Sequence, residues 1–368
     1  MTDEHYMKQA LILAQKGCGF VAPNPMVGAV IVKNDQIIGQ GFHEGYGLPH
    51  AERNALADCT ESEEGATLYV TLEPCCHFGK TPPCTDAIIN SGISKVVIGS
   101  SDPNPMVGGM GVKQLRNKGI MVVEGVLKEE CDLLNSIFFH YIKTGLPFVV
   151  MKYAMTMDGK IATHTGESKW ITGEASRQRV QEDRHRYTAI MVGVGTVISD
   201  DPLLTCRLEG GKNPIRVICD TQLRTPLSAQ VVRTTQEAPT ILATCCDDKK
   251  KHQAYTQSGC YVMVLPEMAG HLDLKALMIQ LGHEKIDSIL LEGGATLNAS
   301  ALNTGIVNKV QAYIAPKIFG GKQALSPIGG GGVDHPEGAY FLKNTVITPY
   351  GDDFLLESEV ISHVYRNH

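Results

Sequence analysis

Four residues in the first part of the chain have the chemistry of a catalytic zinc site. His50 and Glu52 are two positions apart. Cys75 follows a Glu-Pro dipeptide, and Cys84 lies nine positions further on. A catalytic zinc ion takes three protein ligands and keeps a fourth position open for water. One imidazole and two thiolates meet this need, and water held by such an ion loses a proton near neutral pH to become a nucleophile.

Glu52 supplies the proton transfer that a hydrolytic deamination requires. It lies in the first turn of a helix that we expect to begin near His50, so it can reach the metal site without being a ligand. A carboxylate there can carry protons from water to a ring nitrogen and to the departing ammonia. His-x-Glu followed by Pro-Cys is the pattern of zinc deaminases of nucleotide bases. The sequence therefore predicts such an enzyme, with Glu52 as general acid and base.

The second half of the zinc pattern leaves two alternatives open. The expected Cys-x-x-Cys is replaced by a longer spacing, with Cys76 as a rival ligand to Cys75. We choose Cys75, together with His50 and Cys84, and expect both cysteines at or near helix N-termini, where the helix dipole favours thiolate. A closed structural zinc site would need a fourth ligand such as His77 and would leave Glu52 without a role.

Composition limits the partners and the compartment. The chain has 368 residues and a net charge of −6, which disfavours a nucleic-acid partner and leaves room for a small phosphorylated substrate. Eleven cysteines, an odd number, favour metal binding or buried thiols over a disulfide framework. No apolar run approaches the roughly 18 residues of a membrane span. Residues 1–8 lack a signal pattern, so we expect a cytoplasmic protein without a membrane partner.

The order of the expected elements indicates two α/β domains. Residues 1–145 alternate helices with strands and predict a three-layer α/β/α sandwich. The expected helices are 3–16, 50–58, 84–90, 112–117 and 128–141, and the strands are 27–33, 36–41, 67–72, 95–100 and 120–123. After Thr144 and Gly145 the pattern restarts in a second α/β domain, residues 146–368. Its expected helix is 175–186 and its strands are 148–154, 189–194, 215–220, 240–243, 261–265, 288–291, 310–315 and 354–360.

Several longer motifs carry a family resemblance over nearly the whole chain. Residues 75–84 (CCHFGKTPPC), with 23–28 (PNPMVG) and His50–Glu52, closely resemble the bifunctional deaminase–reductase family of riboflavin biosynthesis. In the second half, residues 152–162 (KYAMTMDGKIA), 166–172 (GESKWIT) and 200–207 (DDPLLTCR) are similar to the reductase domain of that family.

The resemblance implies two folds and two reactions. The first domain would have the cytidine-deaminase fold and deaminate 2,5-diamino-6-ribosylamino-4(3H)-pyrimidinone 5′-phosphate with Zn²⁺. The second would have the dihydrofolate-reductase fold. It would use NADPH to reduce the ribosyl group of 5-amino-6-(5-phosphoribosylamino)uracil to ribityl. Its partners would be these small pyrimidine ribosyl phosphates, and the chain would form a homodimer or homotetramer through its reductase domain.

Three further residues are candidates for binding the deaminase substrate. Asn24 lies in a turn between two prolines, and its side-chain amide suits the edge of a pyrimidine, although a plain turn-former is the alternative. His77 and Lys80 lie between the two cysteines, where either could meet the substrate phosphate or remain in a solvated loop. The run Asn-Pro-Met-Val-Gly occurs at 24–28 and again at 104–108, which we interpret as two similar turns.

Glycines after strands suggest where a dinucleotide binds in the second domain. Residues 192–198 (VGVGTVI) lack the third glycine of the dinucleotide fingerprint and are a weak signal. Gly293, Gly294, Ala295 and Thr296 follow a strand and precede a helix, so their backbone N–H groups can bind a pyrophosphate. Thr221 and Arg224, after another strand, could recognise the 2′-phosphate of NADPH, although Arg224 could equally be a surface arginine.

The family correspondence adds further residues of the reductase site. It places on the cofactor Ala154, Trp170, Thr196, Asp200 and Thr221, and on the substrate Ser168, Arg184, Leu204, Arg207 and Glu292. Arg184 and Arg207 are fork donors that suit a ribose phosphate. Trp170, the single tryptophan, would on its own suggest core packing. Glu292 and Lys152 are both candidates to protonate the imine that receives the hydride.

Rival functions differ in substrate or in chemistry. A deaminase of another nucleotide, or of nucleic-acid bases, with an appended reductase-like domain would share the zinc chemistry. For a nucleic-acid substrate it would need a basic surface and aromatic stacking positions. The net charge and the 6% aromatic content disfavour it. A non-catalytic protein with a structural zinc would not need Glu52, and a chain with one degenerate domain would lack motif residues that are present here.

Overall fold

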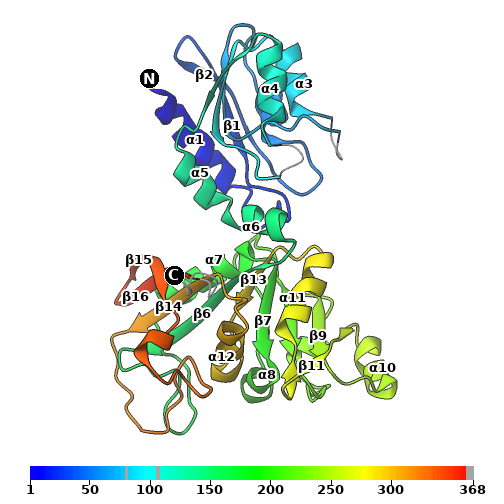
Figure 1. Ribbon diagram of the computed structural model, residues 1–368, viewed down its shortest axis with the longest axis vertical. Coiled ribbons are helices and arrows are strands. Elements are labelled where there is room, and N and C mark those ends of the chain that lie inside the picture. The colour runs from blue at the N-terminus through cyan, green and yellow to red at the C-terminus, as the bar shows by residue number, and fades with distance from the viewer. Residues whose placement is uncertain (79–81, 105–107, 362–368) are drawn as a thin grey trace. The chain divides into compact units, whose positions relative to one another are not determined.

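The computed structural model describes residues 1–78, 82–104 and 108–361. The chain divides into two compact units, Met1–Gly145 and Leu146–His368, and each unit is built on its own central sheet (Figure 1). Across the described residues, every helix is too short or too polar to cross a lipid bilayer.

The first unit contains a five-stranded sheet in the order β2-β1-β3-β4-β5. Its strands are β1 (Gly28–Lys33), β2 (Gln36–Phe42), β3 (Thr67–Leu72), β4 (Lys95–Ser100) and β5 (Met121–Glu124). β1 pairs antiparallel with β2 and β3, whereas β3, β4 and β5 are parallel. The carboxyl ends of β3 and β4 therefore meet at one edge of the sheet.

Helices cover both faces of this sheet, which confirms the predicted three layers (Figure 1). One face carries α1 (Asp3–Gln15) and α5 (Lys128–Leu134), and the other carries α2 (Ala51–Ala57), α3 (Cys84–Asn90) and α4 (Met110–Asn117). Met7 and Ala10 of α1 pack on Val30 and Val97 of the sheet. A side chain at Gly28 would come within 1.9 Å of the Ala10 carbonyl oxygen, so the close approach of α1 to β1 requires glycine there.

The predicted long helix over residues 128–141 is wrong. The structure has two helices instead, α5 and α6 (Ser136–Thr144), which meet at Asn135. The Asn135 side chain accepts a hydrogen bond from the Met26 backbone N–H at 2.8 Å and donates one to the Met26 carbonyl at 2.9 Å. This buried amide pair fixes the break between the helices and ties it to the turn that contains Asn24, a long-range contact that helical periodicity does not reveal.

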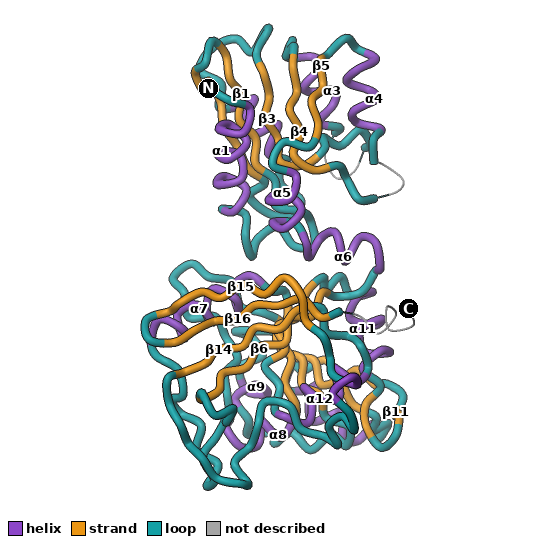
Figure 2. Tube along the Cα trace, turned by 60° about the vertical axis from the view of Figure 1, so that its left-hand side comes forward, coloured by secondary structure: helices purple, strands orange, loops and turns teal. Residues whose placement is uncertain are grey.

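The second unit contains a nine-stranded sheet in the order β10-β9-β8-β7-β13-β6-β14-β16-β15. The strands from β10 through β14 are parallel, and β16 and β15 add an antiparallel edge beside β14. β14, β16 and β15 lie side by side in Figure 2. Their bounds are β6 (Phe148–Thr156), β7 (Ala189–Gly193), β8 (Ile215–Cys219), β9 (Thr240–Thr244), β10 (Tyr261–Val264), β13 (Ser288–Leu291), β14 (Lys309–Ala315), β15 (Leu342–Tyr350) and β16 (Asp353–Val360). This second α/β architecture agrees with the predicted fold class.

The sequence did not predict β15 or the small hairpin of β11 (Glu267–Met268) and β12 (His271–Leu272). The side chains of β15 are nearly all exposed, so the strand lacks the apolar alternation that marks a half-buried strand. Pro349 is tolerated because β15 lies at the edge of the sheet, beside β16.

Helices of the second unit lie around this sheet and connect its strands. They are α7 (Glu174–Arg186), α8 (Val194–Asp200), α9 (Gln230–Arg233), α10 (Lys249–Gln257), α11 (Leu274–His283), α12 (Ala295–Asn303) and the 3₁₀ turn η1 (Pro336–Gly338). α8 follows β7 directly and α12 closely follows β13, so both helix N-termini lie at the carboxyl edge of the parallel strands.

We expect Asn135→Ala to destabilise the protein by about 2 kcal/mol, because it leaves the partly buried N–H and carbonyl groups of Met26 without their partner. Denaturant unfolding of the full-length chain measures this loss. Asn117→Ala removes an exposed asparagine at the end of α4 and serves as the control, with an expected change within about 0.5 kcal/mol. Equal stability of the two variants would contradict the anchoring role of Asn135.

Candidate active sites

Three side chains from separate elements form a group that can hold a metal ion. His50 precedes α2, Cys75 follows β3, and Cys84 begins α3. Their ligand atoms lie within 4.8 Å of one another. His50 Nδ1 is 3.5 Å from Cys75 Sγ and 3.4 Å from Cys84 Sγ. One imidazole and two thiols in this arrangement fit a zinc ion that keeps an open position.

Neither of the rival ligands joins this group. Cys76 and His77 are not members of it, and within residues 1–78, 82–104 and 108–361 the group has three members. A closed four-ligand site therefore lacks its fourth ligand among the described residues. The geometry favours Cys75 over Cys76, an alternative that the sequence left open.

The expectation that both cysteines lie at or near helix N-termini is confirmed, with Cys84 at the start of α3 and Cys75 in contact with that start. Cys75 lies in the irregular segment after β3. It nevertheless contacts the start of α3 in space, because the backbone N–H of Cys84 donates a hydrogen bond to Cys75 Sγ at 3.3 Å. Hydrogen bonds from the Cys84 side chain and from His50 lower the pKa of Cys75 despite its burial, so a thiolate is favoured there.

Glu52 lies beside the metal-binding group in the first turn of α2. Its side chain is only 3% exposed. Burial, with the charge of Cys75 adding to it, raises the pKa of Glu52 to about 7. A carboxyl group with this pKa exchanges its proton readily at neutral pH, which suits a general acid and base.

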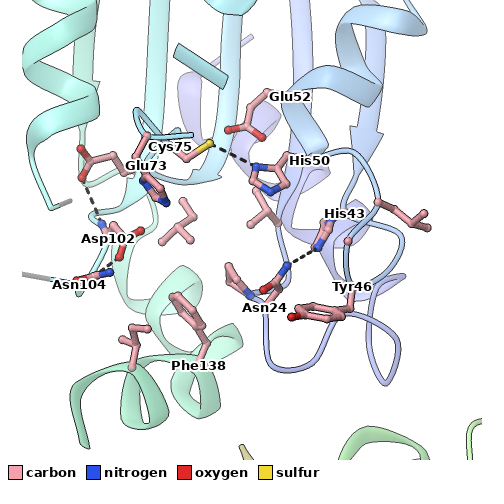
Figure 3. A pocket seen from close by; sticks show the side chains of 17 residues that line it. Asn24, His43, Tyr46, His50, Glu52, Glu73, Cys75, Asp102, Asn104 and Phe138 are labelled. Atoms are coloured by element: carbon pink, nitrogen blue, oxygen red, sulfur yellow. Dashed lines mark hydrogen bonds between the residues drawn. The ribbon is translucent and has the colours of Figure 1, made fainter. Parts of the chain in front are cut away.

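A cavity of about 320 Å³ opens in front of these residues (Figure 3). This volume suits a single small ligand. Asn24 lines it, and its Nδ2 is 3.2 Å from His43 Nε2. His43 Nδ1 in turn lies 3.1 Å from the Pro49 carbonyl oxygen. A proton on Nδ1 satisfies that carbonyl and leaves Nε2 to accept from Asn24, which fixes the orientation of the Asn24 amide.

Two other residues of this domain, His77 and Lys80, were predicted to bind the substrate phosphate. His77 lines the cavity and is exposed. Lys80 lies outside the described residues.

Sequence reasoning missed several residues of the cavity wall. Polar ones come from loops after the strands, and apolar ones come from α6 and from the segment before α2. They are His43, Tyr46, Leu48, Glu73, Asp102, Asn104, Phe138 and Ile142. The repeated Asn-Pro-Met-Val-Gly run was a usable signal, because Asn24 and Asn104, at its two starts, line the same cavity.

Glu73 organises the loop that carries two of these residues. Its buried carboxylate accepts hydrogen bonds from the backbone N–H groups of Asp102, Gly109 and Val112, at 3.3, 2.9 and 3.2 Å. Asp102 in turn accepts from the N–H of Asn104 at 2.8 Å. Asp102 and Asn104 are thereby held at the cavity wall (Figure 3).

A second cavity, of about 1180 Å³, lies in the second unit. It is large enough for a dinucleotide and a second ligand together. Every residue that the sequence assigned to the reductase site lines it: Ala154, Ser168, Trp170, Arg184, Thr196, Asp200, Leu204, Arg207, Thr221, Arg224, Glu292, Gly293, Gly294, Ala295 and Thr296. Most of them follow the carboxyl ends of β7, β8 and β13, the edge at which open α/β sheets bind ligands.

Glu292 forms a charged group with two basic side chains in this cavity. Arg184 donates to both of its carboxylate oxygens, through Nε at 2.9 Å and Nη2 at 3.1 Å, and Lys152 Nζ lies at 3.7 Å. Burial alone raises the pKa of Glu292, but the charges of Arg184 and Lys152 outweigh it and lower this pKa to about 2. The carboxyl group therefore stays ionised at physiological pH.

The turn after β8 has its own buried anchor. Asp220 accepts hydrogen bonds from the backbone N–H groups of Arg224 at 2.6 Å and Thr225 at 2.7 Å, and from the Thr225 hydroxyl at 2.8 Å. These contacts set the backbone between Thr221 and Arg224, and both residues line the cavity. The β11–β12 hairpin, absent from the expected elements, contributes Gly270, His271 and Leu272 to the same wall.

The two units together define a class of enzyme. A three-layer α/β/α unit with a His-Cys-Cys group beside a buried glutamate is the arrangement of zinc-dependent base deaminases. It is joined to an α/β unit with a large cavity at the carboxyl ends of its parallel strands.

Comparisons with known proteins agree with this class. Residues 1–100 match the cytidine and deoxycytidylate deaminase zinc-binding region, and residues 147–356 match the RibD C-terminal domain. The riboflavin biosynthesis protein RibD of Actinobacillus pleuropneumoniae is 56% identical over 98% of this chain and 96% of its own length. RibD of Aquifex aeolicus is 46% identical over 96% of this chain and 97% of its own length.

Solved structures give the same result. Acinetobacter baumannii RibD superimposes with a TM-score of 0.88 at 36% identity, covering 98% of this chain and 99% of that one. A Thermotoga maritima diaminohydroxyphosphoribosylaminopyrimidine deaminase/5-amino-6-(5-phosphoribosylamino)uracil reductase superimposes with a TM-score of 0.85 at 41% identity, with the same coverage. The chain belongs to the RibD family of bifunctional riboflavin-biosynthesis enzymes, with a zinc-binding deaminase domain and an NADPH-dependent reductase domain.

The metal-binding group predicts which cysteines hold zinc. We expect Cys75→Ser and Cys84→Ser to lose most of their zinc after dialysis, because each removes a thiolate from a three-ligand group. The neighbouring Cys76→Ser is the matched control and should retain one zinc ion per chain, as measured by atomic absorption. Retention of zinc by Cys75→Ser together with its loss from Cys76→Ser would reverse the assignment.

Proposed function

We propose that residues 1–145 catalyse the hydrolytic deamination of 2,5-diamino-6-ribosylamino-4(3H)-pyrimidinone 5′-phosphate. Residues 146–368 then reduce the ribosyl group of the product, 5-amino-6-(5-phosphoribosylamino)uracil, to ribityl with NADPH. The observation that carries the proposal is the buried Glu52 beside His50, Cys75 and Cys84 in a cavity of about 320 Å³. The activities in the name of the Thermotoga maritima relative, which this chain matches over nearly its full length, support both substrates.

In the deaminase domain, His50, Cys75 and Cys84 hold the zinc ion, which when bound lowers the pKa of water at the site. Glu52 takes a proton from the attacking water and delivers it to the ring nitrogen next to the amino-bearing carbon. The second proton comes from the hydroxyl group that the water has become. The same carboxyl group carries it to the amino group as the C–N bond breaks. One water is consumed, and one ammonia and one carbonyl group are formed.

Three residues bind the substrate of this domain. Asn24 Nδ2 donates a hydrogen bond to His43 Nε2. The side-chain oxygen of Asn24 is therefore available to accept a hydrogen bond from an N–H group of the pyrimidine. His77 and Lys80 belong to the segment between the two cysteines and bind the phosphate of the substrate.

In the reductase domain, two sets of residues divide the large cavity. NADPH is bound by Ala154, Trp170, Thr196, Asp200, Thr221, Arg224, Gly293, Gly294, Ala295 and Thr296. The ribosyl phosphate substrate is bound by Ser168, Arg184, Leu204, Arg207 and Glu292. The protein aligns the nicotinamide with C1′ of the substrate, which becomes electrophilic when the ribosylamine opens to an imine. A hydride from NADPH goes to C1′ and a proton goes to the imine nitrogen.

Lys152 is a better source of this proton than Glu292. The pKa of Glu292 is lowered to about 2 by its two basic neighbours, so its carboxyl group carries no proton to give at neutral pH. Lys152 lies next to it at the cavity wall, where its side-chain nitrogen can donate to a bound ligand. Glu292 instead holds Arg184 and Lys152 in place.

We also propose that the chain acts in the cytoplasm as a homodimer or homotetramer through its reductase domain. The exposed edge strand β15, which carries the exposed apolar side chains of Val346 and Ile347, supports an interface on that domain.

A two-channel assay tests both activities at once. The diaminopyrimidinone phosphate is supplied with NADPH, and ammonia release and NADPH oxidation are followed together. Ammonia should appear first, and NADPH loss should depend on it. Glu52→Gln should slow ammonia release by at least about 100-fold while zinc stays bound, because the proton carrier is removed.

A variant in the reductase domain, Arg207→Ala, is the control for Glu52→Gln. Arg207→Ala should weaken reduction and leave ammonia release unchanged, because Arg207 lines the second cavity and is not among the described lining residues of the first. Normal ammonia release by Glu52→Gln would remove its role as general acid and base. Equal damage to both reactions by Arg207→Ala would contradict two separate sites.

Arg224 should determine the preference for NADPH over NADH. We expect Arg224→Ala to weaken NADPH binding by about tenfold, because a charge-assisted contact to the 2′-phosphate is lost. Its affinity for NADH, which lacks that phosphate, should stay unchanged in isothermal titration. A matched loss for both cofactors would mean that Arg224 does not contact the 2′-phosphate.

A further inference from the structure

Trp170 stands out among the residues of the reductase cavity because its side chain is 61% exposed on an irregular segment. It lies before α7, outside any helix or strand, yet it lines the cavity. A large ring on such a segment ordinarily moves among several positions, and ordering it costs free energy when a ligand binds. The surroundings of Trp170 remove much of that freedom.

Three charged side chains hold the backbone around Trp170. Lys317 donates hydrogen bonds through Nζ to the Trp170 carbonyl at 3.0 Å and to the Ile171 carbonyl at 2.6 Å. Arg177 donates through Nη1 to the Thr172 carbonyl at 2.7 Å. The next backbone N–H group, that of Gly173, donates to the buried carboxylate of Asp353 at 2.7 Å. Four successive residues are thus fixed by partners from three different parts of the chain.

The same arginine also holds the indole ring. The guanidinium carbon of Arg177 lies 4.9 Å from the centroid of the Trp170 ring, within the range of a cation–π contact. One guanidinium group therefore fixes both the ring and the backbone two residues further on. Trp170 lines the cavity, whereas Arg177 is not among its lining residues. The arginine thus lies over the indole ring, and the indole in turn lines the cavity.

We propose that Arg177 is a positioning residue of the reductase, which presents the indole of Trp170 to a planar ring of NADPH. The inference rests on the proposed contact of Trp170 with the cofactor. Arg177 acts through Trp170, by holding the indole in its binding orientation before NADPH arrives. Lys317 supports the same arrangement from the backbone side.

The single tryptophan makes this inference directly measurable. All tryptophan emission of the chain comes from Trp170, and bound NADPH should quench it by energy transfer to the reduced nicotinamide. Titration of the full-length, zinc-loaded protein with NADPH should show this quenching. Arg177→Ala should weaken NADPH binding by about tenfold, the scale of a lost cation–π contact and its preorganisation. KM for NADPH should rise, with kcat and ammonia release nearly unchanged.

A double-mutant cycle separates positioning from general stabilisation. NADPH affinity is measured by isothermal titration for Arg177→Ala, Trp170→Ala and the double variant. If Arg177 acts through Trp170, its replacement should have no further effect once the indole is gone. Additive losses would overturn the proposal.

Two further variants keep the test informative if Arg177→Ala folds poorly. Arg177→Gln keeps an N–H donor for the Thr172 carbonyl but removes the cation, and it should still weaken NADPH binding. Arg233→Ala, an exposed arginine on α9, is the matched control and should bind NADPH normally. Unchanged affinity in Trp170→Ala would contradict the proposed cofactor contact itself. Weaker binding in Trp170→Ala, with normal binding in both Arg177 variants, would overturn this inference alone.

Discussion

Parallel pairing of strands is the constraint on which both sites depend. Hydrogen bonding between β3 and β4 brings their carboxyl ends together, so that the segments with Cys75 and Asn104 meet. In the second unit, the pairing of β8, β7 and β13 does the same for the segments with Thr221, Thr196 and Glu292. Residues far apart in sequence become neighbours because each chain segment leaves the sheet at the same edge. The clusters that pack on each sheet are mainly apolar.

Two buried glutamates show how neighbours decide the state of a carboxyl group. Glu52 and Glu292 are both largely removed from water. Around Glu52, burial and a nearby thiolate raise the pKa to about 7, and the group can accept and release a proton. Around Glu292, two cations lower the pKa to about 2, and the group becomes a permanent anion that orients other side chains. Burial alone does not predict a catalytic acid.

The sequence predicted the chemistry better than the shape of the cavities. His50, Glu52, Cys75 and Cys84 could be chosen because metal coordination restricts both residue type and spacing. The split at Asn135 could not, since it depends on a contact with Met26 more than a hundred residues away. Phe138 and Ile142 of α6 look like ordinary apolar positions until that helix is placed against the cavity. β15 was missed because an exposed edge strand has no buried face to mark it.

In the turn after β8, one residue sets the backbone conformation and two others line the cavity. Its backbone is set by Asp220, whose carboxylate is fully buried and bonds to the chain at Arg224 and Thr225. The side chains of Thr221 and Arg224 are not needed to form the turn. They can therefore be exchanged in evolution, or by an engineer, without refolding the loop that carries them. With the proposed contact of Thr221 and Arg224 to the 2′-phosphate, the choice of nicotinamide cofactor would be a modular trait, which could change while the scaffold is inherited intact.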